Sequence, residues 1–125
     1  MLTTTGSFSG YSVDDLAAAA AFYRDILGLT VEDSGAGLDV HLPDGHVFLY
    51  PKDDHVPATF TVLNFEVADI DAAVAELTAA GVALERYEGM PQDDSGVMRG
   101  KAAGMGPDIA WFLDPAGNVL SILNG

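Results

Sequence analysis

The sequence contains no cysteine among its 125 residues, which excludes a disulfide framework and a thiolate metal site. Basic residues are also scarce, because five Lys and Arg stand against nineteen Asp and Glu, for a formal net charge of −14. Nucleic acids and anionic membranes are bound through clustered Lys and Arg, so we expect neither as a partner. No apolar run approaches the length of a membrane span, and residues 1–6 lack the pattern of a signal peptide. We therefore expect a cytoplasmic protein.

Residues 60–82 predict a strand, a tight turn and a helix. Apolar and polar residues alternate over 63–67, which is the period of a half-buried strand. Asp69 stands where a helix N-cap belongs, and Gly81 can take the left-handed conformation that ends a helix. Between them lies an apolar stripe at helical spacing, formed by Ile70, Val74 and Leu77.

The same pattern occurs once earlier in the chain. Val13 and Asp15 precede Val67 and Asp69 by 54 positions each, 67 − 13 and 69 − 15. Each half also ends on a similar turn, Pro43-Asp44-Gly45-His46 in the first and Asp114-Pro115-Ala116-Gly117-Asn118 in the second. The valine, the aspartate and the turn therefore recur in the same order in both halves. This recurrence indicates two copies of a unit with a strand, a helix and three further strands, with chance recurrence as the alternative.

These copies predict an α+β fold in a single domain over residues 1–125. Module one spans 7–51, a connection spans 52–58, and module two spans 59–125. Each module supplies a small sheet with its helix outside, so we expect paired βαβββ modules that form an open, curved mixed sheet. The sheet faces without helices would line a concave cleft.

Module two carries an addition that module one lacks. We expect a strand over 82–87 and then a long loop over 88–106, where six of nineteen residues are Gly or Pro. Long loops in compact domains often bind ligands or close over them, and a surface excursion is the alternative.

A resemblance to one known family extends over nearly the whole chain and rests on four motifs: Val13-Asp14-Asp15-Leu16, Phe22-Tyr23-Arg24-Asp25-Ile26-Leu27-Gly28, Val67-Ala68-Asp69-Ile70-Asp71-Ala72-Ala73-Val74 and Asp114-Pro115-Ala116-Gly117-Asn118. The pattern resembles the vicinal oxygen chelate superfamily, which includes glyoxalases, bleomycin-resistance proteins and extradiol dioxygenases. The resemblance implies paired βαβββ modules in an open barrel and a homodimer.

Enzymes of this superfamily hold a divalent metal with His or Gln at the head of each module's first strand and Glu near the end of each last strand. The resemblance places Phe8, Val62, Leu49 and Ser121 at these positions, and among them Ser121 alone is a weak ligand. We therefore predict no metal and no other cofactor, with a divalent metal as the alternative. The three histidines, expected at the surface or packed on turns, are His41, His46 and His55.

Alternation along the strands and the composition of the long loop nominate ten ligand-binding residues: Phe8, Ser12, Leu49, Val62, Asn64, Glu66, Tyr87, Met98, Trp111 and Ser121. Aromatic rings on an open face would stack on a flat ligand, and methionines add adaptable apolar contacts. Glu66 is the candidate catalytic residue, as an acid or base, or it orients a cationic group of the ligand. Core packing remains the alternative for each aromatic residue.

Two functions remain open. The first is a small-molecule-binding protein of the glyoxalase or bleomycin-resistance type that lacks the usual metal ligands and binds an organic ligand in the cleft. The alternative is a glyoxalase-type lyase, isomerase or dioxygenase that uses a divalent metal or acid/base chemistry at Glu66. In both cases the partner is a small organic molecule.

Overall fold

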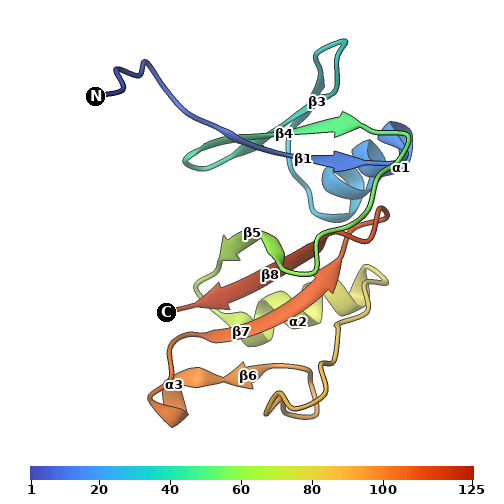
Figure 1. The fold of residues 1–125 in the computed structure, drawn as a ribbon. Coiled ribbons are helices and arrows are strands. Elements are labelled where there is room, and N and C mark those ends of the chain that lie inside the picture. The colour runs from blue at the N-terminus through green and yellow to red at the C-terminus, as the bar shows by residue number, and fades with distance from the viewer. The chain divides into compact units, whose positions relative to one another are not determined.

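The computed structural model describes residues 1–125 and divides them into two compact units, Met1–Pro57 and Ala58–Gly125, called unit one and unit two below. Each unit contains a four-stranded mixed sheet with its own helical segment (Figure 1). Unit one consists of β1 (Ser9–Val13), α1 (Leu16–Ala21), the π-helical turn η1 (Phe22–Ile26), β2 (Val31–Asp33), β3 (Leu38–Leu42) and β4 (Gly45–Pro51). Unit two consists of β5 (Thr61–Glu66), α2 (Ile70–Ala79), β6 (Met98–Arg99), α3 (Gly100–Ala103), β7 (Asp108–Leu113) and β8 (Val119–Asn124).

The two sheets share one topology. Their strand orders are β1-β4-β3-β2 and β5-β8-β7-β6, so the first strand of each unit lies beside its last strand. This first pairing is parallel and the other pairings are antiparallel. The repeat and the glyoxalase-like α+β class that the sequence predicts are therefore confirmed. The longest helix has ten residues, and none could cross a bilayer.

In unit one the core lies between the sheet and the helical segment. Asp15 caps α1 by accepting a hydrogen bond from the Ala18 amide at 3.1 Å. The predicted helix over 15–27 is not continuous, because α1 gives way to the π-helical turn η1 at Phe22. The Tyr23 hydroxyl on η1 lies 2.7 Å from the Tyr11 hydroxyl on β1, and both residues are buried. This bond marks the side of the sheet that faces the helical segment.

In unit two the helix is regular and its sheet side is apolar. Asp69 caps α2 by accepting from the Ala72 amide at 3.1 Å, and Gly81 follows the helix with a φ of 87°. The strand residues that pair across the sheet on the α2 side are buried, as are the apolar residues of the helix: Ala110, Phe112, Leu120, Ile122, Ile70, Val74 and Leu77. Burial of this interface supplies the main driving force for folding of the unit.

The fourth strand of unit two differs from the prediction. The strand expected over 82–87 is wrong, because the chain makes a single bridge there, between Leu84 and Phe112. It then leaves the sheet and returns as β6, which pairs with the first residues of β7. Residues 88–106 are accordingly not one loop, since they include β6 and α3. In unit two the edge of the sheet thus consists of two separate pieces, the bridge at Leu84 and β6, with an insertion over 86–97 between them, whereas in unit one β2 alone forms this edge.

Candidate functional site

The side of the unit-two sheet opposite α2, called the open face below, carries two rows of aligned side chains. The register pairs Asn64 with Ser121, and Ser121 with Trp111. The Glu85 amide donates to the Trp111 carbonyl at 2.8 Å, and the adjacent bridge of Leu84 with Phe112 sets Glu85 opposite Trp111. Paired residues of neighbouring strands share one side of a sheet, about 5 Å apart. One row therefore reads Asn64, Ser121, Trp111, Glu85, and the next row reads Glu66, Leu123, Ile109, Met98.

A polar pair occupies one end of the first row. The Ser121 hydroxyl donates to the Asn64 side-chain oxygen at 2.5 Å. Ser121 is fully buried, whereas Asn64 is exposed. The bond uses the oxygen of the Asn64 amide, so its N–H groups are donors that the pair presents to solvent or to a ligand.

An aromatic pair occupies the other end of the row. The rings of Tyr87 and Trp111 meet edge to face, with centroids 5.5 Å apart and planes at 78°. Trp111 is 8% exposed and Tyr87 is 36% exposed, so this pair forms a wall with one accessible ring. Burial raises the pKa of the Tyr87 hydroxyl, and the nearby charge of Glu85 adds to the effect. Tyr87 is therefore a neutral hydrogen-bonding group at physiological pH.

The side chain of Gln92 links the two ends of the insertion by hydrogen bonds to the backbone. Its side-chain oxygen accepts from the Tyr87 amide at 2.8 Å. Its side-chain nitrogen donates to the carbonyls of Glu85 at 2.9 Å and Gly96 at 2.7 Å. The Gln92 side chain thus connects the backbone at the start of the insertion with the backbone at its end. It holds Glu85 and Tyr87, the two residues that lie beside Trp111.

Arg99 ties the insertion to α2 through an ion-pair network. Its guanidinium contacts Asp71 on the first turn of α2 at 2.6 Å and 3.4 Å, and Asp93 in the insertion at 2.9 Å. Hydrogen bonds from Ser95 and Arg99 hold the pKa of Asp93 well below its usual range, and Arg99 lowers the pKa of Asp71. Asp93 also accepts from the Val97 amide at 3.0 Å. These bonds hold the insertion as a fixed element.

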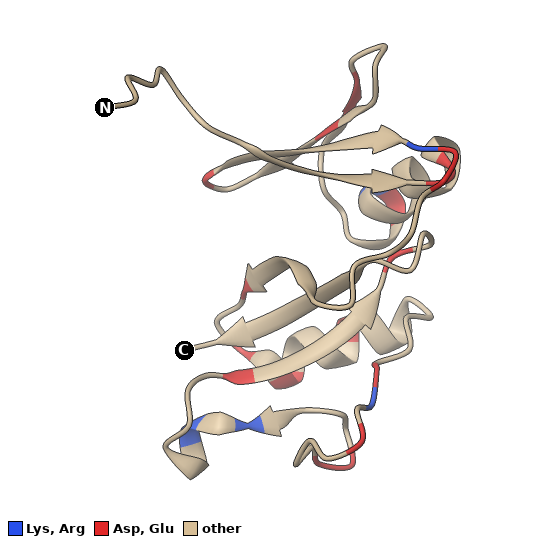
Figure 2. Cartoon of the chain, viewed as in Figure 1, with Lys and Arg blue, Asp and Glu red and all other residues tan.

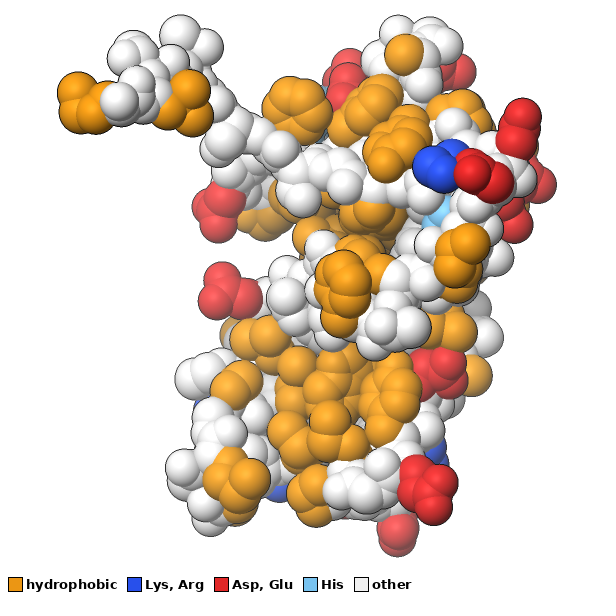
Figure 3. All heavy atoms as spheres, viewed as in Figure 1, with side chains coloured by type: hydrophobic (Ala, Val, Ile, Leu, Met, Phe, Trp, Pro, Cys, Tyr) orange, Lys and Arg blue, Asp and Glu red, His pale blue; other side chains and the backbone are white.

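The open face of unit two carries no basic side chain. Figure 2 shows the basic residues of this unit on the insertion, β6 and α3, and none on β5, β7 or β8. Arg99 pairs with Asp108 in the register and so lies on the side of α2, and Arg86 donates to the Asp94 carbonyl at 2.5 Å. Figure 3 shows hydrophobic side chains gathered over β7 and β8. The face is apolar, with carboxylates at its two edges.

The corresponding face of unit one has a different composition. Its register aligns a row that reads Gly10, Phe48, Asp39, Glu32. Phe48 and Tyr50 stack with centroids 6.2 Å apart, and the Ser12 hydroxyl lies 2.6 Å from Nδ1 of His55. The face is therefore richer in acidic and imidazole groups than that of unit two.

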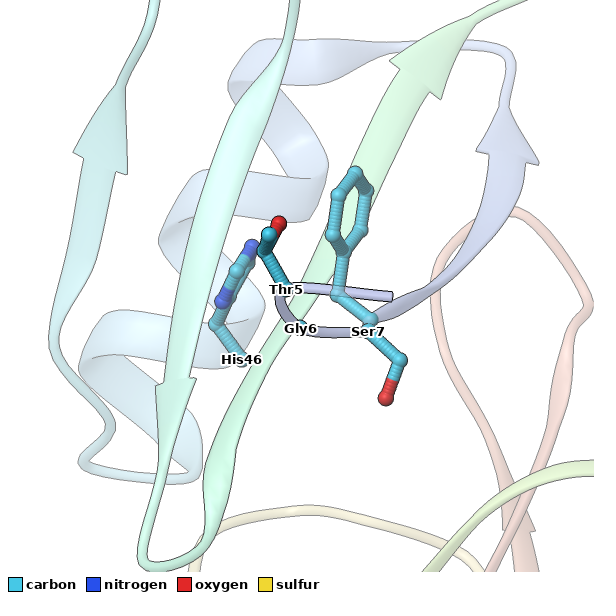
Figure 4. Close-up of a pocket in the computed structure, with 5 residues that line it drawn as sticks. Thr5, Gly6, Ser7 and His46 are labelled. Atoms are coloured by element: carbon cyan, nitrogen blue, oxygen red, sulfur yellow. The ribbon is translucent and has the colours of Figure 1, made fainter. Parts of the chain in front are cut away.

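A hollow of about 550 Å³ opens at the edge of this face, and Figure 4 shows His46 and the segment Thr5–Ser7 around it. Phe8 completes the lining and is 64% exposed. Its ring stacks on the His46 ring with centroids 4.8 Å apart. The hollow is wide open and is bordered mainly by an exposed N-terminal segment, so it offers few fixed polar groups for a specific ligand.

Leu49 does not lie on the open face of unit one, so that part of the prediction is wrong. It pairs with Tyr11, shares the helix side of the sheet and is fully buried. Its neighbour Phe48 takes the position on the open face that Ser121 takes in unit two. Aligning the two turns by their last residues, His46 and Asn118, would match Leu49 with Ser121, but the first turn is one residue shorter, so Gly45 matches Asn118 instead. A shift of one residue moves a strand side chain to the opposite face.

The other nominated residues fall into three groups. Asn64, Glu66, Met98, Trp111 and Ser121 come together on the open face of unit two, with Tyr87 at its margin. Val62 lies in a bulge of β5 and has no partner in the register. Phe8 and Ser12 belong to unit one. Glu85 was not among the residues nominated from the sequence, although its spacing of two from Tyr87 places both on one side of an extended chain.

The donor groups do not suit the divalent metal of the superfamily. Phe8, Phe48 and Val62 have hydrocarbon side chains, and the Ser121 hydroxyl donates to Asn64. Elsewhere, His41 contacts Glu32 at 3.0 Å and His46 lies 3.9 Å from Asp39. No group of three or more His, Cys, Asp or Glu side chains is placed to hold a metal ion.

Comparisons with known proteins agree with this architecture. A family model described as Glyoxalase/Bleomycin resistance protein/Dioxygenase superfamily matches residues 7–122. No curated protein matches the chain significantly in sequence.

Three solved structures illustrate the likeness. The fosfomycin resistance protein FosX from Listeria monocytogenes has 16% identity and a TM-score of 0.71, with 99% of this chain and 95% of that chain covered. Lactoylglutathione lyase from Agrobacterium tumefaciens has 21% identity and a TM-score of 0.66, with coverages of 98% and 95%. An integron cassette protein from the mobile metagenome of the Halifax Harbour sewage outfall has 20% identity and a TM-score of 0.70, with coverages of 98% and 100%. At these identities the likeness establishes the fold alone.

Proposed function

The chain belongs to the glyoxalase/bleomycin resistance protein/dioxygenase superfamily, and from this premise we propose that it binds a small organic molecule, without a metal ion, on the open face of unit two. The ligand would lie on the apolar surface of Leu123, Ile109 and Met98, bounded by the Tyr87–Trp111 pair. The Asn64–Ser121 pair would supply the polar contact.

The observation that carries this proposal is the first row of the open face, in which a half-buried hydroxyl–amide pair, an indole and a carboxylate lie side by side. Ligand sites are typically apolar surfaces with a few well-placed polar groups. Here Ser121 orients the Asn64 amide, and Gln92 fixes the backbone of Tyr87. Groups held in this way lose little conformational entropy when a ligand binds.

The chemistry of the donor groups supports binding without a metal. Three of the four positions that the superfamily uses for metal ligation carry hydrocarbon side chains. The fourth position carries Ser121, whose hydroxyl donates a hydrogen bond to Asn64. A divalent cation needs imidazole or carboxylate groups that converge.

The proposal is tested with acridine, a neutral flat probe whose ring nitrogen accepts a hydrogen bond. We expect acridine to quench the emission of Trp111, which is the sole tryptophan. Tyr87→Ala should weaken binding about tenfold, because an aromatic contact contributes about 1 kcal/mol. Met105→Ala is the control, since Met105 is exposed and lies outside the face.

Metal analysis of protein purified without chelator completes the test, and we expect no stoichiometric metal. Nickel, zinc, manganese or iron at one equivalent, lost in His41→Ala, would favour the metal-dependent enzyme instead. Equal acridine affinity for Tyr87→Ala and the wild type would place the ligand elsewhere.

A further inference from the structure

We propose that Glu85, together with Trp111 and Tyr87, holds a cationic group of the ligand, so that the protein selects organic cations such as quaternary or protonated amines. This inference rests on the proposed function, and it adds the chemical class of the ligand and a residue that decides it.

The first observation is the position of Glu85. It lies opposite Trp111, and its amide donates to the Trp111 carbonyl at 2.8 Å. Tyr87 follows two residues later and its ring meets the indole at 5.5 Å. A carboxylate and two aromatic rings therefore surround one corner of the open face. Aromatic faces and carboxylates together form the usual environment for quaternary ammonium groups in proteins.

The second observation is the charge balance of this face. The rows of this face contain the carboxylates Glu85 and Glu66 and no Lys or Arg, because Arg99 of β6 lies on the side of α2. Arg86, next to Glu85 in the chain, donates to the Asp94 carbonyl, and Arg99 pairs with Asp71 and Asp93 on the side of α2. No basic side chain on the face therefore neutralises Glu85. The net charge of −14 also raises the local concentration of cations and lowers that of anions.

The third observation is the way in which this corner is held. Gln92 donates to the Glu85 carbonyl and accepts from the Tyr87 amide, so one side chain fixes both residues against Trp111. The charge of Glu85 also contributes to the raised pKa of Tyr87, which places the two side chains within electrostatic reach of each other. A cation at this corner would interact with both without rearrangement of the backbone.

Glu66 provides a matched comparison. It lies in the neighbouring row at the opposite edge, three strand spacings or about 14 Å from the strand position of Glu85. It is exposed and has no aromatic partner in the register. Its charge would add to the field, but it would not contact a cation at the Trp111 corner.

The test compares benzyltrimethylammonium with neopentylbenzene, which has the same shape and no charge, by titration of the Trp111 emission. We expect the cation to bind the wild type about tenfold more tightly than the neutral probe. Glu85→Gln should abolish that preference, Glu85→Asp should keep it, and Glu66→Gln should change it by less than about twofold.

Each outcome decides the matter. Loss of the preference in Glu66→Gln and not in Glu85→Gln would overturn the assignment to Glu85. Equal affinity of the two probes for the wild type would refute selection of cations and leave the proposed binding face intact. Failure of both probes and of acridine to bind would refute the binding face itself.

Discussion

The two units share a sheet topology and differ in the side chains that the sheets present. Where unit two has Asn64, Ser121 and Trp111 in a row, unit one has Gly10, Phe48 and Asp39. The residue at the far end of the row is a carboxylate in both, Glu85 in unit two and Glu32 in unit one. Because the strand order and the pairing directions are the same and the faces are not, the repeat specifies the fold, while individual side chains specify the chemistry.

The shared carboxylate illustrates the difference. In unit one Glu32 contacts the imidazole of His41 at 3.0 Å, so it has a partner within its own sheet. In unit two the corresponding position carries Glu85 beside an aromatic pair, on a face without Lys or Arg, and the neighbouring Arg86 donates to the Asp94 carbonyl. The same residue type at the same place in the repeat is therefore satisfied in one unit and available for an organic cation in the other.

The largest expected effect contrasts two adjacent residues of unit one. Leu49→Ala should lower the free energy of unfolding by about 3 kcal/mol, because it leaves a cavity on the buried helix side. Phe48→Ala should cost less than half of that, since Phe48 lies on the open face and is only half-buried. Urea unfolding of both variants measures the difference. A larger loss for Phe48→Ala would contradict the assignment of the two faces.

A smaller effect contrasts the two hairpin turns. Asp114 is buried and accepts from the Ala116 amide, the Asn118 amide and the Asn118 side chain at 2.8 to 3.0 Å. Asp114→Ala should cost about 2 kcal/mol, because it leaves buried donors without an acceptor. Asp44→Ala in the exposed turn of unit one should change stability by less than about 0.5 kcal/mol. Thermal unfolding would refute the contrast if the two losses were equal.

The smallest effect concerns the network of Arg99, which has no counterpart in unit one. The pKa values of Asp93 and Asp71 lie below their ordinary value of 3.8, so both carboxylates stabilise the fold above that pH. Arg99→Gln should therefore lower the unfolding midpoint at neutral pH, and the deficit should shrink as the pH falls below about 4.

The exposed pair of Arg24 and Asp25 in unit one provides the control for that prediction. Arg24→Gln should leave the midpoint nearly unchanged at both pH values, because an exposed pair between neighbouring residues contributes little. A deficit for Arg99→Gln that stayed constant down to pH 3 would contradict the role of the carboxylates.

Much of the fold could be predicted from two short signals. The spacing of Val13-Asp14-Asp15 and Val67-Ala68-Asp69 revealed the repeat, and both aspartates cap helices as expected. Alternation also brought Asn64, Trp111 and Ser121 to one face, because β5, β7 and β8 run without a shift through those residues. These features depend on local periodicity, which the sequence carries directly.

The remaining features depend on pairings that periodicity does not reveal. Leu49 was placed on the wrong face because the first turn is one residue shorter than the second. Side chains of a strand alternate between its two faces, so a shift of one residue moves each of them to the opposite face. The strand over 82–87 failed because the insertion draws the chain away from β7 after Glu85. The importance of Glu85 follows only from that pairing.

The interruption of the fourth strand in unit two has a consequence for behaviour at high concentration. A long, straight outer strand with free amide and carbonyl groups is a template for amyloid-like stacking between chains. Here β6 has two residues, and the bridge between Gln92 and Met98 covers its outer side. Deleting residues 87–97 would leave Arg86 to pair opposite Ala110 and would restore an uninterrupted strand, so we expect that deletion to increase aggregation.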